Sequence, residues 1–191
     1  MSTTAVPTYL TPEEYITAER KAMIKSEYFS GKIIADSGAS LEHNLITVNV
    51  VNELYNQLVE HGCRVFGSDM RVGIGSGMSY FYPDVSVVCD TPRFEDDVLD
   101  ILLNPIVVVE VLSQSTEVYD RGEKFRRYQQ LESLQEYILI SQERVQVERY
   151  QRQVEKWQSQ VLTSIEDTMK LVSVNAEIPL HQIYRFVEIN D

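Results

Sequence analysis

The stretch from Val107 to Leu112, Val-Val-Val-Glu-Val-Leu, constrains the fold more than any other part of the sequence. A nearly continuous aliphatic run of this kind is typical of a strand that is buried on both faces of a sheet. After it the sequence predicts a helix and then a second strand over Glu136 to Ser141. A strand, a helix and a strand in this order predict a parallel crossover unit. We therefore expect an α/β domain with the first of these strands at the centre of its sheet.

Cap and spacing signals predict three helices. Thr11-Pro12-Glu13-Glu14 supplies a capping hydroxyl, a proline at the first helical position and a glutamate three residues after the cap, which predicts a helix over about 12–24. Ser40 caps a second predicted helix. The apolar residues that define its helical spacing are Leu41, Leu45, Val48, Val51, Leu54 and Leu58. A third helix is expected to begin at Asp120, in a pattern that resembles a capping box, and to continue through Leu131.

Turn residues separate the expected strands. Two short strands are expected around Ser30-Gly31, and further strands at 64–66, 70–74, 80–89 and on either side of 151–153. A chain of 191 residues suits one core but not two. Because no composition break marks a linker, we expect a single domain over 1–191, with a core of about 9–150 and a β-rich C-terminal extension.

Charge and hydropathy limit the possible partners. The chain has 17 Lys and Arg against 29 Asp and Glu, a net charge of −12, which disfavours unspecific adhesion to nucleic acid or anionic lipid but not a local basic patch. The longest apolar run, Ile106 to Val109, falls far short of the roughly 20 residues that a membrane span requires. We therefore expect no membrane partner.

The two cysteines offer little chemistry. Cys63 and Cys89 lie 26 residues apart without a Cys-x-x-Cys motif, so we expect neither a disulfide scaffold nor a thiolate metal site. Cysteine usage of this kind fits a reducing compartment best. A cytoplasmic location is the corresponding expectation.

Two carboxylates stand at unusual places in predicted strands. Glu110 interrupts the aliphatic run, where an unpaired charge would cost several kcal/mol. Pro83 predicts a strand start, a bulge or a bend that directs Asp84 to a defined place. Two carboxylates on neighbouring strands would suit Mg²⁺ or Mn²⁺. In the alternative interpretation, Asp84 caps a turn and Glu110 pairs with a core arginine.

Several short motifs occur in order along the chain. They are Glu27-Tyr28-x-x-Gly31, Ser40-x-x-His43-Asn44, Ser68-Asp69-Met70-Arg71-Val72, Tyr82-Pro83-Asp84-Val85, Glu110-Val111-Leu112-Ser113-x-Ser115-Thr116 and Asp120-Arg121-Gly122-Glu123-Lys124. Over roughly residues 9–150 this set resembles the Uma-two family of restriction-endonuclease-like proteins. The resemblance implies the PD-(D/E)XK nuclease fold, a mixed central sheet flanked by helices, and metal-dependent hydrolysis of phosphodiester bonds.

The resemblance also implies roles for individual residues. Asp84 and Glu110 match the two acidic positions of the motif and would bind Mg²⁺ or Mn²⁺, with Glu27 as a third ligand. His43 would orient a water or contact phosphate. The motif lysine should stand two residues after Glu110, where this chain has Leu112. Lys124, on the following helix, is expected to replace it.

The sequence leaves an alternative to catalysis open and predicts the partners of the protein. The alternative for Lys124 is an ordinary solvent-exposed helix residue. The alternative for the whole protein is a nuclease fold that has lost catalysis and serves as a binding or interaction module, which Leu112 at the motif lysine position and the net charge of −12 favour. The leading expectation is a Mg²⁺-dependent endodeoxyribonuclease. Arg121, Arg126 and Arg127 would then bind nucleic acid, with DNA as the expected substrate. A homodimer is expected because nucleases that cut both strands usually pair.

Overall fold

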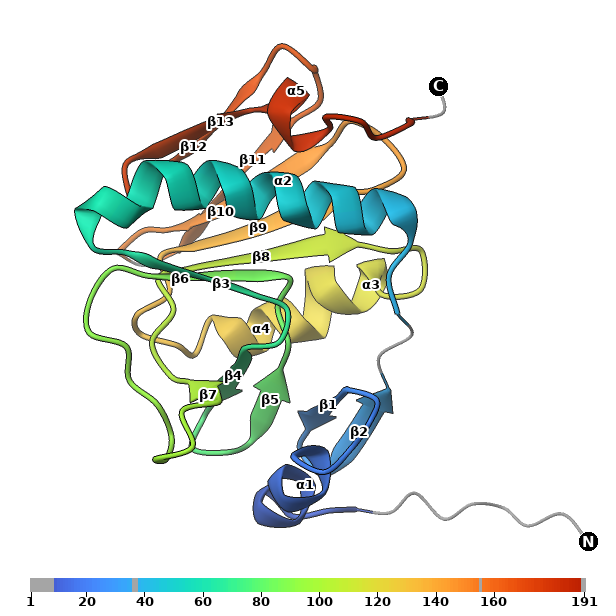
Figure 1. Cartoon of the computed structure of the whole chain (residues 1–191), viewed down its shortest axis with the longest axis vertical. Helices are drawn as coiled ribbons and strands as arrows, with labels where there is room; N and C mark the ends of the chain where they lie inside the picture. Colours follow the sequence, from blue (N-terminus) through green and yellow to red (C-terminus); the bar gives the residue numbers. More distant parts are fainter. Residues whose placement is uncertain (1–8, 36–37, 155, 190–191) are drawn as a thin grey trace, which may run out of the picture.

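A computed structural model describes residues 9–35, 38–154 and 156–189 (Figure 1). The helical elements are α1 (Pro12–Glu19), α2 (Leu41–Leu58), a 3-10 turn (Val59–His61), α3 (Glu117–Tyr119), a π-helical turn (Asp120–Lys124), α4 (Phe125–Tyr128) and α5 (Leu180–Ile183). The strands are β1 (Ser26–Phe29), β2 (Lys32–Ala35), β3 (Arg64–Gly67), β4 (Arg71–Ile74), β5 (Ser79–Phe81), β6 (Val85–Val88), β7 (Ile101–Leu102), β8 (Val107–Leu112), β9 (Glu136–Ser141), β10 (Val147–Arg152), β11 (Trp157–Leu162), β12 (Thr168–Leu171) and β13 (Ala176–Pro179). Within the described ranges, none of the helices has the length and apolarity to cross a bilayer.

A six-stranded mixed sheet forms the centre of the molecule, in the order β11-β10-β9-β8-β6-β3. Its β8 and β9 run parallel, and the helical segment from α3 to α4 connects them, as the crossover prediction requires. β8 lies inside the sheet, which confirms its predicted central place. A second sheet has the order β2-β1-β5-β4-β7, and β12 pairs with β13.

The central sheet separates two layers of the core (Figure 1). On one face Val107, Val109 and Val111 of β8 join a cluster with the buried side of α2. On the other face Val108 and Leu112 join a cluster with residues of α4. Because side chains alternate along a strand, Glu110 points to the same side as Val108 and Leu112, under the segment from α3 to α4.

The segment Tyr80 to Cys89 is two strands rather than the single strand predicted. β5 belongs to the second sheet, and β6 belongs to the central sheet. The break falls at Pro83, which lacks the backbone N–H that a continuous strand would need. The chain therefore passes from one sheet to the other directly before Asp84.

The predicted helices are present, with three corrections. α1 ends at Glu19 rather than near residue 24, because the Glu19 carboxylate accepts hydrogen bonds from the backbone and hydroxyl of Ser26 and closes the turn between them. The third helical segment begins at Glu117, so Asp120 lies inside it instead of capping it. α2 has the predicted Ser40 cap, but Leu41 and Val48 are exposed. Its buried residues are Ile46, Val50, Leu54 and Leu58.

Cys63 and Cys89 form a disulfide, contrary to the expectation from their spacing. The antiparallel register of β3 and β6 pairs Arg64 with Val88, so the two cysteines are the next opposed residues beyond that pair. Their sequence separation of 26 residues carried no signal for this pairing, because the pairing depends on strand register.

Candidate active site

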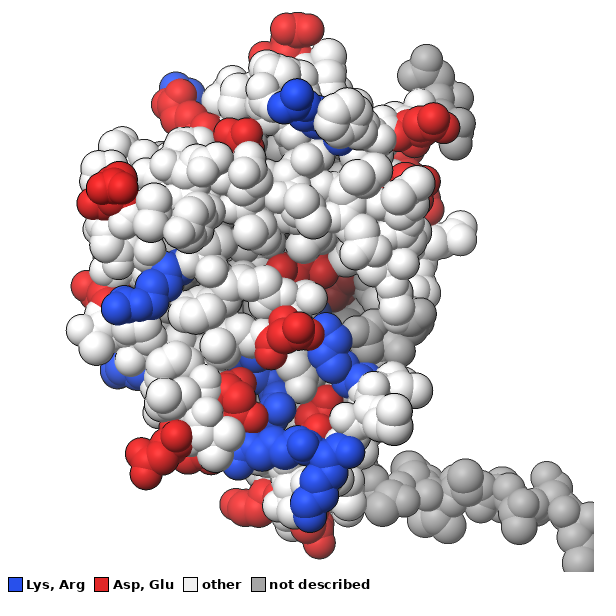
Figure 2. All heavy atoms as spheres, viewed as in Figure 1, with Lys and Arg blue, Asp and Glu red and all other residues white. Residues whose placement is uncertain are grey.

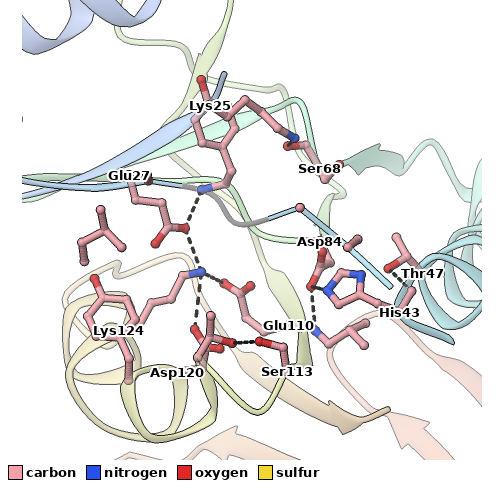
Figure 3. A pocket seen from close by; sticks show the side chains of 18 of the residues that line it. Lys25, Glu27, His43, Thr47, Ser68, Asp84, Glu110, Ser113, Asp120 and Lys124 are labelled. Atoms are coloured by element: carbon pink, nitrogen blue, oxygen red, sulfur yellow. Dashed lines mark hydrogen bonds and ion pairs between the residues drawn. The ribbon is translucent and has the colours of Figure 1, made fainter. Parts of the chain in front are cut away.

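Asp84 and Glu110 lie opposite each other on neighbouring strands. The register of β6 and β8 pairs Val85 with Val109, and one position further it brings Asp84 to Glu110. Asp84 Oδ2 accepts a hydrogen bond of 2.7 Å from the Val111 amide and lies 3.3 Å from His43 Nε2 (Figure 3). The Asp84 carboxylate thus reaches across to β8 rather than capping a local turn.

Lys124 connects three acidic side chains. Its Nζ lies 2.8 Å from Glu27 Oε1, 2.9 Å from Glu110 Oε1 and 3.6 Å from Asp120 Oδ1 (Figure 3). The Lys124 side chain is only 6% exposed, so the solvated alternative for this residue is wrong. Glu110 pairs with this lysine and not with a core arginine.

The π-helical turn Asp120–Lys124 presents both of its end residues to the site. A π turn holds one residue more than an α turn and is often found at functional sites. Asp120 and Lys124 are both buried, which is unusual for charged residues on a short helix. The π-helical turn therefore brings two charged side chains to the site, although their burial costs solvation free energy.

Neutral donors complete the hydrogen bonding of the two glutamates. Tyr128 donates to Glu110 Oε1 at 3.2 Å, and the Tyr82 amide donates to Glu27 Oε1 at 3.1 Å. The donor from Tyr82 lies at the break between β5 and β6. The same break that delivers Asp84 thus also holds Glu27.

The site carries more acid than base. Burial raises the pKa of Glu110 well above its ordinary value, and Asp120, Asp84 and Glu27 raise it further, while Lys124 opposes the shift. Burial would lower the pKa of Lys124, but Glu110, Glu27 and Asp120 raise it well above its usual range. The lysine therefore stays charged at neutral pH, and Glu110 holds a proton more readily than an ordinary glutamate. A bound cation would relieve this excess of negative charge.

A pocket of about 430 Å³ opens onto these groups. Its wall includes Glu27, His43, Asp84, Glu110, Asp120 and Lys124, together with Lys25, Ser68, Ser113, Thr116 and Tyr119. Figure 2 shows Lys and Arg side chains mixed with Asp and Glu around a hollow in the lower half of this face, whereas the surface over α2 is largely uncharged. The structure thus brings together all five residues predicted to be catalytic.

The donor set suits a hard divalent cation held in part by water. Among the described residues, no group of three His, Cys, Asp or Glu side chains is arranged as a metal cage. Asp84 and Glu110 nevertheless offer two carboxylates in one pocket, and Mg²⁺ is often held by one or two carboxylates with several waters. Glu27, the expected third ligand, is engaged by Lys124 and Tyr82.

The arginines predicted to bind nucleic acid do not line the pocket. Arg121 pairs with Glu117 at 2.7 Å and with Glu148. Arg127 lies over the ring of Phe29 and 3.4 Å from Glu123. Arg126, with a side chain 76% exposed, is the most accessible of the three. Arg121 and Arg127 are therefore engaged by acidic and aromatic side chains of this chain.

Sequence reasoning missed two groups of site residues. Asp120 was expected to be a helix cap, although its spacing of four residues from Lys124 would place both on one face of a helix. Tyr82 and Tyr128 belong to the ordered motifs but were given no role there, and Tyr119 carried no signal of its own. Their roles depend on how the two sheets and the helical segment meet.

The sequence of this chain is similar to those of known proteins. The model of the Uma2 family, described as "Putative restriction endonuclease", matches residues 12–180. Two Synechocystis sp. proteins are similar: sll1609 is 40% identical over 150 residues, 78% of this chain and 85% of its own, and slr1290 is 37% identical over 176 residues, 92% of each chain.

A solved structure also resembles this one. The crystal structure described as that of a "putative nuclease belonging to DUF820" from Anabaena variabilis has a TM-score of 0.74 and 19% identity, covering 94% of this chain and 99% of its own. This likeness confirms the predicted fold class, a mixed sheet flanked by helices.

Proposed function

Because the chain belongs to the Uma2 family of restriction-endonuclease-like proteins, we propose that its pocket hydrolyses phosphodiester bonds in nucleic acid with the help of Mg²⁺ or Mn²⁺. The observation that carries the proposal is the position of Lys124 Nζ, 2.9 Å from Glu110 Oε1. Leu112 points to the same side of β8 as Glu110 and packs in the core there. An ammonium from the segment above that side can therefore take the place of the missing motif lysine.

Each side chain has a distinct role in this proposal. Asp84 and Glu110 would hold the ion, which when bound polarises the phosphate and lowers the pKa of a bound water. Lys124 would stabilise the negative charge that develops on the phosphate. Glu27 holds Lys124 in the pocket and remains a candidate third ligand. His43 keeps Asp84 in place and can orient a water.

Two observations favour a second candidate function, a catalytically inactive fold that binds a partner. Lys124 already neutralises part of the charge of Glu27 and Glu110, and the described residues form no three-ligand metal cage. Such a protein would bind nucleic acid without cutting it. The two functions therefore differ in one observable, the cleavage of a bound strand.

The test is a cleavage assay with matched carboxylate variants. Supercoiled plasmid, single-stranded DNA and RNA are incubated with the protein and Mg²⁺ or Mn²⁺, with EDTA as the metal-free control. Asp84→Asn should abolish cleavage. Asp97→Asn, the same change at an exposed side chain outside the pocket, should preserve it.

Two outcomes would contradict the proposal. Equal cleavage by the parent and Asp84→Asn would place the activity outside this pocket. Binding of a labelled strand without any cleavage by the parent, in either metal, would favour the inactive binding module.

A further inference from the structure

The hydroxyl of Tyr119 differs from the other tyrosine hydroxyls of the pocket in its hydrogen bonding. Its oxygen is fully buried, and no described residue forms a hydrogen bond with it. By contrast, the hydroxyl of Tyr128 donates to Glu110, and that of Tyr82 bonds Arg71 and Glu19. A buried hydroxyl without a partner costs free energy, so such groups are rare unless something absent from the protein itself satisfies them.

Tyr119 is held in a defined position on the pocket wall. Its ring makes an edge contact with Phe81 at 6.4 Å between centroids. It directly precedes the π-helical turn, and it lines the pocket together with Ser113 and Thr116. These three hydroxyl residues follow one another at intervals of three and form a neutral, donor-rich wall beside the carboxylates.

A neutral donor suits the ligand that this site is proposed to take. The carboxylates of the pocket repel a phosphodiester, and Lys124 is already engaged by three of them. A phenol hydroxyl can donate to a phosphate oxygen without adding to that repulsion. Burial and the nearby Glu27 carboxylate raise the pKa of Tyr119, so the hydroxyl keeps the proton that it would donate.

We propose that the Tyr119 hydroxyl, which is closed off in the protein alone, becomes accessible when a phosphodiester enters this pocket and donates a hydrogen bond to one of its non-bridging oxygens. The inference rests on the proposed nuclease function and adds a substrate-contacting residue to it. Tyr119 is then a catalytic residue in the strict sense, because it touches the reacting phosphate. Its unpaired state in the protein alone is the consequence of this role.

The test is Tyr119→Phe, which removes the hydroxyl and keeps the ring. With a labelled DNA strand and Mn²⁺, we expect the cleavage rate to fall about 10- to 100-fold, the loss typical of one hydrogen bond to a charged group. The rise in melting temperature caused by Mn²⁺ alone should stay as in the parent. The metal-free melting temperature should hold or rise, because an unpaired buried hydroxyl is removed.

Two other tyrosines supply matched controls. Tyr55→Phe removes an exposed hydroxyl on α2 outside the pocket and should change neither rate nor melting temperature. Tyr184→Phe removes a hydroxyl that bonds the carbonyls of Ser141 and Arg144. Its melting temperature should fall, which shows what the loss of a satisfied hydroxyl looks like in this fold.

Three outcomes decide the inference. If the parent cleaves and Tyr119→Phe cleaves equally fast, the inference is wrong and the proposed function stands. If Tyr119→Phe melts at a lower temperature, as Tyr184→Phe does, its hydroxyl has a structural partner and the inference is overturned. If the parent does not cleave at all, the proposed function fails, and the inference falls with it.

Discussion

Two buried glutamates on neighbouring strands of one sheet have opposite surroundings. Glu136, at the start of β9, is fully buried and accepts hydrogen bonds from the amides of Val172 and Ser173 at 3.2 and 3.0 Å and from the Ser173 hydroxyl. Glu110, on β8, is 4% exposed. Its partners are the side chains of Lys124 and Tyr128, with further carboxylates beside them.

The difference separates a structural acid from one suited to chemistry. Glu136 is tied mainly to backbone donors that cannot leave, with Arg149 Nη1 3.8 Å from its Oε1, and it fixes the turn after β12 to the central sheet. Glu110 is held by side chains that can exchange one partner for another, and it opens onto a pocket. Burial alone therefore does not mark a functional carboxylate, whereas burial beside like charge and open space does.

The sharpest test of this comparison is the same substitution at both positions. Glu110→Gln should lower Mn²⁺-dependent cleavage by at least about 10³-fold, because a ligand of the ion is lost. Its metal-free free energy of unfolding should hold or increase at neutral pH. Glu136→Gln should instead lower that free energy by about 2–4 kcal/mol, since backbone donors lose a charged acceptor, and leave the activity per folded molecule unchanged.

Cleavage assays and urea titrations of the two variants check this. A large loss of metal-free stability in Glu110→Gln would make Glu110 a structural ion-pair partner like Glu136, and the contrast would disappear.

Lys124→Ala removes the side chain that pairs with Glu110. We expect the cleavage rate to fall by on the order of 10²–10³, as lost electrostatic stabilisation of a transition state does. The affinity for Mn²⁺, measured by calorimetry, should hold or rise, because no ammonium competes for the carboxylates. Arg126→Ala, at an exposed arginine outside the pocket, should change mainly the salt dependence of nucleic-acid binding.

Equal losses in the two variants would mean that the helical segment only provides a basic surface. An unchanged rate in Lys124→Ala would make Leu112→Lys the informative variant, since activity gained there would reveal a decayed site.

Mn²⁺ should stabilise the protein through Glu110 and not through Glu136. At about 100 times its Kd, an ion that binds only the folded state adds about 2.7 kcal/mol. The melting temperature should therefore rise with Mn²⁺ in the parent and in Glu136→Gln. In the double variant Asp84→Ala with Glu110→Ala the rise should vanish, and a rise that persists there would disprove the metal site.

The smallest expected effect is on the pH dependence of stability. The folded pKa of Glu110 is raised above its unfolded value of about 4.3, so between the two values the folded state binds more protons than the unfolded state. The free energy of unfolding should then decrease as pH rises through this window, by at most about 1.4 kcal/mol per pH unit.

Urea titrations between pH 5 and 8 in EDTA measure this decrease. Glu110→Gln should lack the part that Glu110 contributes. An identical slope in the parent and the variant would show that burial does not raise this pKa.

Local patterns predicted the elements better than their assembly. The aliphatic run of β8 and the crossover to β9 follow from periodicity, and the Ser40 cap follows from side-chain chemistry. Pro83 predicted a strand start, a bulge or a bend. That β5 and β6 belong to different sheets could not be predicted, because it depends on long-range pairing. The disulfide was missed for the same reason.

The candidate site shows the same limit. Asp84, Glu110 and Lys124 were identified by motif order and by the oddity of a charge in a hydrophobic strand. The sequence could not show that Lys124 reaches Glu27 and Glu110, because that requires the π turn and the strand register together. Nor could it show which tyrosines have a partner for their hydroxyl groups.

The π turn also has an evolutionary consequence. One residue turns an α-helix by about 100°, so a chain that lost a single codon within Asp120–Lys124 would carry its lysine away from the pocket. Deleting Gly122, which lies inside the π turn, would test this, with loss of cleavage as the expected result and the melting temperature as the check on folding. Positions 112 and 124 are then two alternative positions for a lysine that serves the same carboxylates. A lineage could move between them by one insertion and one point mutation, without rebuilding the sheet.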